Sequence, residues 1–115
     1  MKTRIAMVIA SVFLSTVHME ASAYDGWSGT HQIDSIRTYP DGGVLITMAN
    51  AANPSGCSST DYISLPQDGS EGRKKQYATL LSAYMARDTV ALAFTGCTGG
   101  GTTGYRVIEQ VWLKR

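Results

Sequence analysis

The chain has 115 residues, with 10 lysines and arginines against 9 aspartates and glutamates, so its formal net charge at pH 7 is +1. A chain this close to neutrality has no general electrostatic attraction for nucleic acid or for an anionic membrane, and shape and local hydrogen bonds must select its partners. At this length we expect one domain.

The first 23 residues have the pattern of a secretory signal peptide. Lys2 and Arg4 precede an apolar run from Ile5 to Leu14, and Ala21-Ser22-Ala23 supplies the small-x-small exit. The apolar run is too short to span a bilayer comfortably, although a retained membrane anchor is the alternative. We therefore expect this segment to be removed and residues 24–115 to act outside the cytoplasm, in the periplasm or the extracellular space.

Cys57 and Cys97 are the only cysteines of the chain. In an oxidising compartment such a pair is expected to form a disulfide. The bond would close a loop of about 40 residues and stabilise the fold by roughly 3–4 kcal/mol in the chain-entropy account. Zinc takes four ligands and His31 is the only histidine after the signal peptide, while a catalytic thiol would leave one cysteine unexplained. The sequence therefore predicts neither a metal site nor a cofactor.

Short strands separated by glycine-rich turns are predicted for the first half of the exported chain. The first strand runs from Trp27 to Tyr39, and two isoleucines three positions apart break its period of two, which indicates a β-bulge or strong coil. Pro40-Asp41-Gly42-Gly43 turns the chain into a second strand, residues 44–49, and completes a hairpin. A third, short strand runs from Asp61 to Leu65.

One helix follows, and its pattern is the clearest in the sequence. Its apolar side chains are spaced at i, i+3, i+4, i+7 and i+8, which predicts a single stripe packed on the sheet over about 15 residues. Asp68 and Glu71 have the spacing of a capping box, and Arg87 suits the negative C-terminal end of the helix. The predicted stripe consists of Tyr77, Leu80, Leu81, Tyr84 and Met85.

Two further strands complete the chain. Apolar residues alternate from Val90 into Cys97, and after a glycine-rich loop the fifth strand runs from Tyr105 to Leu113. The order is three strands, a helix and two strands, with the helix between strands 3 and 4. We therefore expect a mainly β (α+β) fold with one helix, a small five-stranded OB-like Greek-key barrel. Another α+β sheet with one helix packed on it would fit the same pattern.

The element order also resembles that of a known family. Trp27-Ser28-Gly29 opens the first strand, a cysteine follows the second, and the segment from Leu80 to Val90 has the form Leu-Leu-x-Ala-Tyr followed by a valine six positions on. In these features the chain resembles the B subunits of bacterial AB5 toxins, particularly the subtilase-cytotoxin and pertussis-like members. The resemblance is topological. It implies a pentameric ring whose helices line a central pore, binding to sialylated or other cell-surface glycans, and delivery of an enzymatic A subunit.

Small residues follow the helix face opposite the apolar stripe, where a solvated helix more often carries paired glutamates and lysines. Small side chains allow a second helix to approach closely. We expect this face to form the interface of a homo-oligomer, with an ordinary solvated face as the alternative. The predicted interface residues are Lys75, Thr79, Ser82 and Ala86. The first turn, Arg73-Lys74-Lys75, either faces an anionic partner or is simply solvated.

The predicted disulfide brings residues 58–62 beside the loop of residues 98–104. Together these segments supply hydroxyls, a carboxylate, an aromatic ring and exposed amides, which are the groups that bind a sugar. Ordinary turn chemistry is the alternative. The predicted ligand-binding residues are Ser58, Ser59, Thr60, Asp61, Tyr62, Thr98, Thr102 and Thr103.

The two tryptophans receive different predictions. Trp27, with Tyr24, is either a stacking platform or a plug over one end of the barrel. Trp112 lies in a well-formed strand and is expected in the core or in an interface rather than at a ligand.

An enzyme is not expected. There is no Ser-His-Asp set with a glycine elbow, and Gly99-Gly100-Gly101 lacks the lysine and the following helix of a phosphate loop. Only a hydrolase using Asp61 and Glu109 stays open. We expect a secreted binding protein without catalysis, a glycan-binding toxin B-like subunit assembled as a ring.

A periplasmic inhibitor or immunity-type protein that blocks a protein partner with one protruding loop is the alternative function. A third interpretation, an OB-type binder of single-stranded nucleic acid, needs a basic groove with interleaved aromatic residues, and a neutral exported chain does not favour one. We therefore expect neither a nucleic-acid partner nor a stable membrane span.

Overall fold

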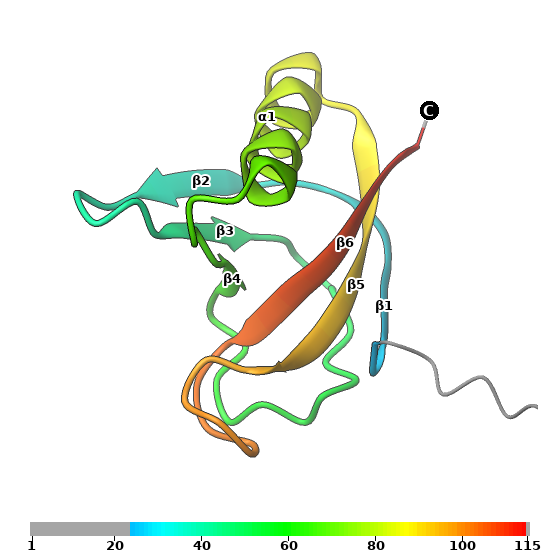
Figure 1. Cartoon of the computed structure of the whole chain (residues 1–115). Coiled ribbons are helices and arrows are strands. Elements are labelled where there is room, and N and C mark those ends of the chain that lie inside the picture. The colour runs from blue at the N-terminus through cyan, green and yellow to red at the C-terminus, as the bar shows by residue number, and fades with distance from the viewer. Residues whose placement is uncertain (1–23, 115) are drawn as a thin grey trace, which may run out of the picture.

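The computed structural model describes residues 24–114, and the predicted signal peptide lies outside these residues. The described part is mainly β, as predicted, with six strands and one helix (Figure 1). The elements are β1 Gly26–Gln32, β2 Ser35–Thr38, β3 Val44–Thr47, β4 Ile63–Leu65, α1 Glu71–Ala86, β5 Thr89–Cys97 and β6 Arg106–Lys114.

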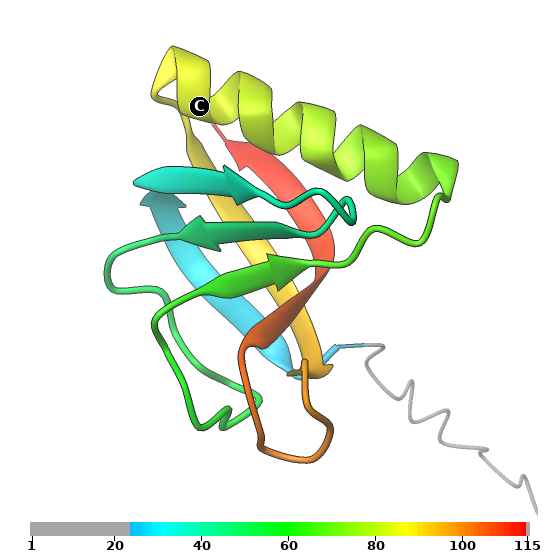
Figure 2. The ribbon, with the colours of Figure 1, turned by 90° about the vertical axis from the view of Figure 1, so that its left-hand side faces the viewer.

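The strands form one curled sheet in the order β1-β5-β6-β4-β3-β2, which has the shape of a half-barrel. Neighbouring strands are antiparallel except β4 and β6, which run parallel. The helix lies across one end of the curl (Figure 2). β1 and β2 are consecutive in the chain and yet form the two edges of the sheet, so the chain passes from one edge to the other through only Ile33 and Asp34.

The predicted single strand from Trp27 to Tyr39 is therefore two strands, and the predicted count of five strands is wrong. The chain changes partner at this point, because β1 pairs with β5 whereas β2 pairs with β3. Asp34 fixes the change: its amide donates to the Thr47 carbonyl at 2.8 Å, and its carboxylate accepts from the Ala49 amide at 2.8 Å. As a consequence α1 follows the fourth strand and not the third.

The core lies between the inner face of the curled sheet and α1. Alternate residues of each strand point inward, as the period of two requires, so that Val44 and Ile46 of β3 are buried while Leu45 is only partly covered. Burying such a side chain stabilises the fold by about 1.5–3 kcal/mol. The fully buried members are Ile46, Ile63, Leu65, Leu80, Ala83, Val90, Leu92, Phe94 and Ile108.

The helix buries a different face from the predicted stripe. Leu80 is fully buried as predicted, but Leu81 and Tyr84 are each 39% exposed and Met85 is 74% exposed. Ala83, which was not part of the stripe, is fully buried. The helix is therefore rotated about its axis, and three of the five residues of the predicted core stripe face outward.

Two polar side chains near the start of α1 explain this rotation. The Arg73 guanidinium donates to the Ile108 carbonyl at 2.6 Å, and the Gln76 amide donates to the Glu109 carbonyl at 2.8 Å. Glu109 sits at a bulge in β6 and has no partner in the β5–β6 register. These two side chains of the helix donate to carbonyls at the bulge, where the β5–β6 ladder is interrupted. Arg73 therefore has a structural role and is not part of an exposed basic turn.

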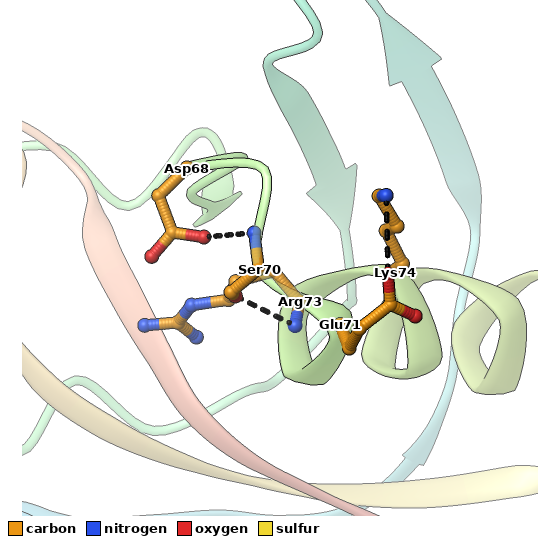
Figure 3. A network of polar contacts seen from close by, with 5 residues as sticks. All are labelled: Asp68, Ser70, Glu71, Arg73 and Lys74. Atoms are coloured by element: carbon orange, nitrogen blue, oxygen red, sulfur yellow. Dashed lines mark hydrogen bonds and ion pairs between the residues drawn. The ribbon is translucent and has the colours of Figure 1, made fainter.

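The helix begins at an N-cap one residue before Glu71 (Figure 3). The Ser70 hydroxyl accepts from the Arg73 amide at 3.2 Å, and the Asp68 carboxylate accepts from the Ser70 amide at 2.8 Å. Hydrogen bonds from Ser70, first its hydroxyl and then its amide, hold the pKa of Asp68 below its ordinary value. The predicted capping box of Asp68 and Glu71 is wrong, because Asp68 lies outside the helix and Glu71 instead pairs with Lys74 at 3.3 Å.

Candidate functional site

The predicted disulfide between Cys57 and Cys97 is confirmed. Both residues are buried, and their Cα atoms are 5.7 Å apart. The bond joins the long loop before β4 to the last residue of β5. It therefore lies at the base of the two segments that were predicted to bind a ligand.

These two segments meet, at the end of the sheet away from α1 (Figures 1 and 2). The Ser58 amide donates to the Thr102 carbonyl at 2.7 Å, and the Ser59 amide donates to the Gly104 carbonyl at 3.1 Å. The Gly104 amide donates in return to the Ser58 hydroxyl at 3.1 Å. The loops thus form one hydrogen-bonded surface, whereas the binding of a ligand there stays a prediction.

The predicted site residues divide into two groups. Three hydroxyls already hold the loops: that of Ser58 accepts as described, that of Thr98 accepts from the Tyr105 amide at 3.0 Å, and that of Ser59 accepts from the Asp61 amide at 3.4 Å. This is the turn chemistry that was the alternative interpretation. The exposed side chains left to face a ligand are Thr60, Asp61, Thr102 and Thr103, with Tyr62 half-buried beside them.

An aromatic and cationic cluster that the sequence interpretation missed continues this surface. The rings of Tyr62 and Tyr105 meet edge to face with centroids 5.4 Å apart, and the Arg37 guanidinium lies 5.3 Å from the Tyr62 centroid. Arg37 also donates to the Tyr39 hydroxyl at 3.5 Å. The contact with Tyr39 first, and then the charge of Tyr62, raise the pKa of Arg37 above its ordinary value.

The sequence held only part of the signal for this cluster. Alternation around Ile36 places Arg37 on the outer face of the sheet, but its meeting with Tyr62 depends on the register of β2 with β3 and of β3 with β4. Rings, a guanidinium and hydroxyls on one exposed surface can stack against the apolar face of a sugar and donate to its oxygens.

Asp25 ties the N-terminal segment to the base of the same surface. Its carboxylate accepts from the Gly96 amide at 2.8 Å and from the Ser55 hydroxyl at 2.7 Å. These bonds, that of Gly96 first, hold the pKa of Asp25 below its ordinary value. A carboxylate with a lowered folded pKa contributes stability above the unfolded pKa of about 3.9, and that contribution is lost as the pH falls through the folded pKa.

We therefore expect Asp25→Asn to lower the melting temperature at pH 7, and we expect the difference from the parent to shrink as the pH falls below about 4. Thermal unfolding followed by circular dichroism between pH 3 and pH 7 measures it. Asp61→Asn is the matched control, because that exposed carboxylate accepts no hydrogen bond within the described chain. A difference that is the same at every pH would contradict the assignment.

The four residues predicted for an oligomer interface all lie on the outward side of α1. Lys75, Ser82 and Ala86 are exposed, and the half-buried Thr79 donates its hydroxyl to the Lys75 carbonyl at 2.9 Å. Part of this side forms an open groove of about 630 Å³, lined by Ala78, Leu81, Ser82, Met85 and Ala86. The small-residue face is therefore continuous with the apolar side chains that the rotation of the helix exposes. Its role in assembly stays a prediction.

The tryptophans lie on the outer face of the sheet. Trp27 pairs with Ala93 of β5, whereas the core residues of β5 are the alternate ones, Leu92 and Phe94. Trp112 is 55% exposed, so its placement in the core is wrong, because the bulge in β6 puts it on the outward side of the strand. Its placement in an interface is untested.

No group of three or more potential metal ligands occurs among residues 24–114. Within the same span, the helix is neither long nor apolar enough to cross a membrane. No protein-family model matches the sequence, and no curated protein matches it.

Proposed function

We propose that the chain is an exported binding protein without catalytic activity, a glycan-binding toxin B-like subunit that assembles as a ring. One observation carries the proposal. The Cys57–Cys97 bond joins two loops into a single exposed surface on which Tyr62, Tyr105 and Arg37 lie beside threonine hydroxyls. Such a surface presents stacking faces and hydrogen-bond donors without a reactive pair of groups.

The arrangement of the sheet supports an OB-like barrel. If β1 and β2 are counted as the halves of one bent strand, the order becomes that of a five-stranded Greek-key barrel with one strand shared by both edges. The helix then lies between the third and fourth strands, as the sequence predicts. The loop of residues 98–105 becomes the connection between the last two strands, and in OB-folds that loop takes part in binding oligosaccharides and oligonucleotides.

The outward face of α1 supports assembly. Leu81 and Met85 are exposed on a helix whose adjoining residues are small, and an exposed apolar strip of this kind commonly marks a protein interface. Another copy packed on this face would cover both side chains. A ring places the helices of successive copies next to one another, as the resemblance to toxin B subunits implies.

The test combines native mass with glycan binding. For the protein purified after expression of the full chain, we expect light scattering to give a mass of five copies and an array of cell-surface glycans to give a signal. Tyr62→Ala is expected to abolish the array signal at unchanged mass, and Met85→Glu is expected to release monomers. Tyr84→Ala, which removes an exposed ring from the helix, is the control for Tyr62. A monomer without glycan binding would contradict the proposal and favour a periplasmic inhibitor of a protein partner.

A further inference from the structure

The two tryptophans of the chain lie together on the outer face of the sheet, over β1, β5 and β6. The rings of Trp27 and Trp112 meet edge to face with centroids 6.0 Å apart, and Tyr24 meets Trp27 in the same way at 5.3 Å. Trp112 is more than half exposed. The solvent-exposed face of a sheet ordinarily carries single, scattered apolar residues. A cluster of three aromatic rings there is unusual and commonly marks a binding site.

The central strand leaves room between the two indoles. Trp27 pairs with Ala93 and Trp112 pairs with Ala91, so the indoles flank two methyl groups on β5. β1 is bulged beside them at Gly29, whose φ of +80° suits glycine. The result is a pocket of about 200 Å³, the indole pocket, lined by Trp27, Gly29, Thr30, Ala91, Trp112 and Lys114.

A buried hydroxyl holds this bulge in place. Ser28 is 1% exposed, and its hydroxyl accepts from the Leu92 amide at 2.9 Å and donates to the Gly29 carbonyl at 2.6 Å. The floor of the pocket is therefore fixed by the fold and does not have to form when a ligand arrives. A pre-formed site loses less conformational entropy on binding.

The indole pocket carries a cation that has no acidic partner among residues 24–114 and that lies over the Trp112 ring. The Lys114 ammonium lies 3.9 Å from the centroid of the Trp112 ring, and the one ion pair among residues 24–114 is that of Lys74 with Glu71. A ligand that fits must therefore bring acceptor oxygens to Lys114 and to the exposed Thr30 hydroxyl, and an apolar face to the indole. A pyranose ring has both: C–H groups on its face and hydroxyl oxygens around its edge.

We propose that the indole pocket is a second carbohydrate site, which holds one pyranose ring against the part of Trp112 that the Lys114 ammonium leaves uncovered, with its hydroxyl oxygens toward Lys114 and Thr30. It is separate from the loop surface, because Tyr105 directly precedes β6 and Trp112 lies seven residues further along the extended chain, or about 20 Å away. Together with the loop surface of the proposed function, the indole pocket would let one copy of the chain bind two sugars, one on the outer face of the sheet and one at the loops. The inference rests on the indole pocket alone and does not need the loops to bind a glycan.

The experiment uses tryptophan fluorescence, because both tryptophans of the chain line the indole pocket. The purified protein is titrated with the methyl glycosides of glucose, galactose, mannose and N-acetylglucosamine. We expect a saturable change in emission with at least one of them. Trp112→Ala should weaken that binding about tenfold, as read from the remaining Trp27, since a lost stacking contact is worth about that much.

Two further variants separate the possible outcomes. Lys114→Gln, a change at a half-buried position that keeps the backbone carbonyl bonded to the Thr89 hydroxyl, should weaken the same titration several-fold. Tyr62→Ala should leave the titration unchanged while it abolishes binding on the glycan array, so a failure of the loop site and a failure of the indole pocket give different results. The proposal would be overturned if none of the four sugars gave a saturable change. It would also be overturned if Trp112→Ala and Lys114→Gln both bound the sugar with the affinity of the parent protein.

Discussion

Replacement of Cys57 and Cys97 together by alanine is expected to lower the free energy of unfolding by about 3–4 kcal/mol. The bond closes a loop whose ends are 40 residues apart, which limits the freedom of the unfolded chain. It also holds the loop before β4 against the end of β5, so the surface that carries Tyr62 is expected to loosen. Urea unfolding followed by circular dichroism measures the first effect, and the glycan array measures the second.

Reduction of the parent protein is the control for this variant. It breaks the same bond and keeps both sulfur atoms in the core, so it separates the loss of the crosslink from the loss of packing at two buried positions. We expect the reduced parent to lose most of the same stability. An unfolding curve that neither change moves would contradict the role of the disulfide.

Arg106→Ala is expected to cost about 3 kcal/mol of stability, although no carboxylate pairs with this arginine in the described chain. The side chain is 2% exposed, and its guanidinium donates to the carbonyls of Ala51, Ala52 and Thr60, each at 3.0 Å. Hydrogen bonds from a charged donor contribute about 1.5–3 kcal/mol each, and the cost of burying the cation offsets part of their sum. Burial also lowers the pKa of Arg106 below its ordinary value.

Two variants at this position test what the guanidinium does. Arg106→Lys keeps the charge but has a single nitrogen for three carbonyls, so an intermediate loss is expected. Arg106→Met fills the space beside Phe94 but leaves the carbonyls without a donor, so a loss close to that of alanine is expected. A methionine variant as stable as the parent would mean that this arginine does not fasten the loop before β4.

The fold was predictable where the signal was local. The hairpin at Gly42-Gly43, the single helix and the disulfide all follow from neighbouring residues or from the compartment, and all are confirmed. The rotation of α1 was not, because it depends on carbonyls that a bulge in β6 offers to Arg73 and Gln76. The division of the first strand likewise depends on a change of pairing partner, which no local pattern records.

The candidate site was likewise predictable from the sequence only in part. The meeting of residues 58–62 with residues 98–104 was predictable, because a covalent bond joins their ends. The additions of Arg37 to the loop surface and of Trp112 to the indole pocket were not, because each depends on strand register across the sheet. A slip of one residue would have turned either side chain to the other face.

The position of β1 and β2 at opposite edges of the sheet has a consequence for folding kinetics. β2, β3 and β4 pair with one another within residues 35–65, so they can associate early. β1 precedes all of them but pairs only with β5, as Gln32 does with Thr89, and closing so large a loop is slow. The ladder of β1 with β5, rather than the hairpin, is therefore expected to set the rate at which the domain reaches its native state.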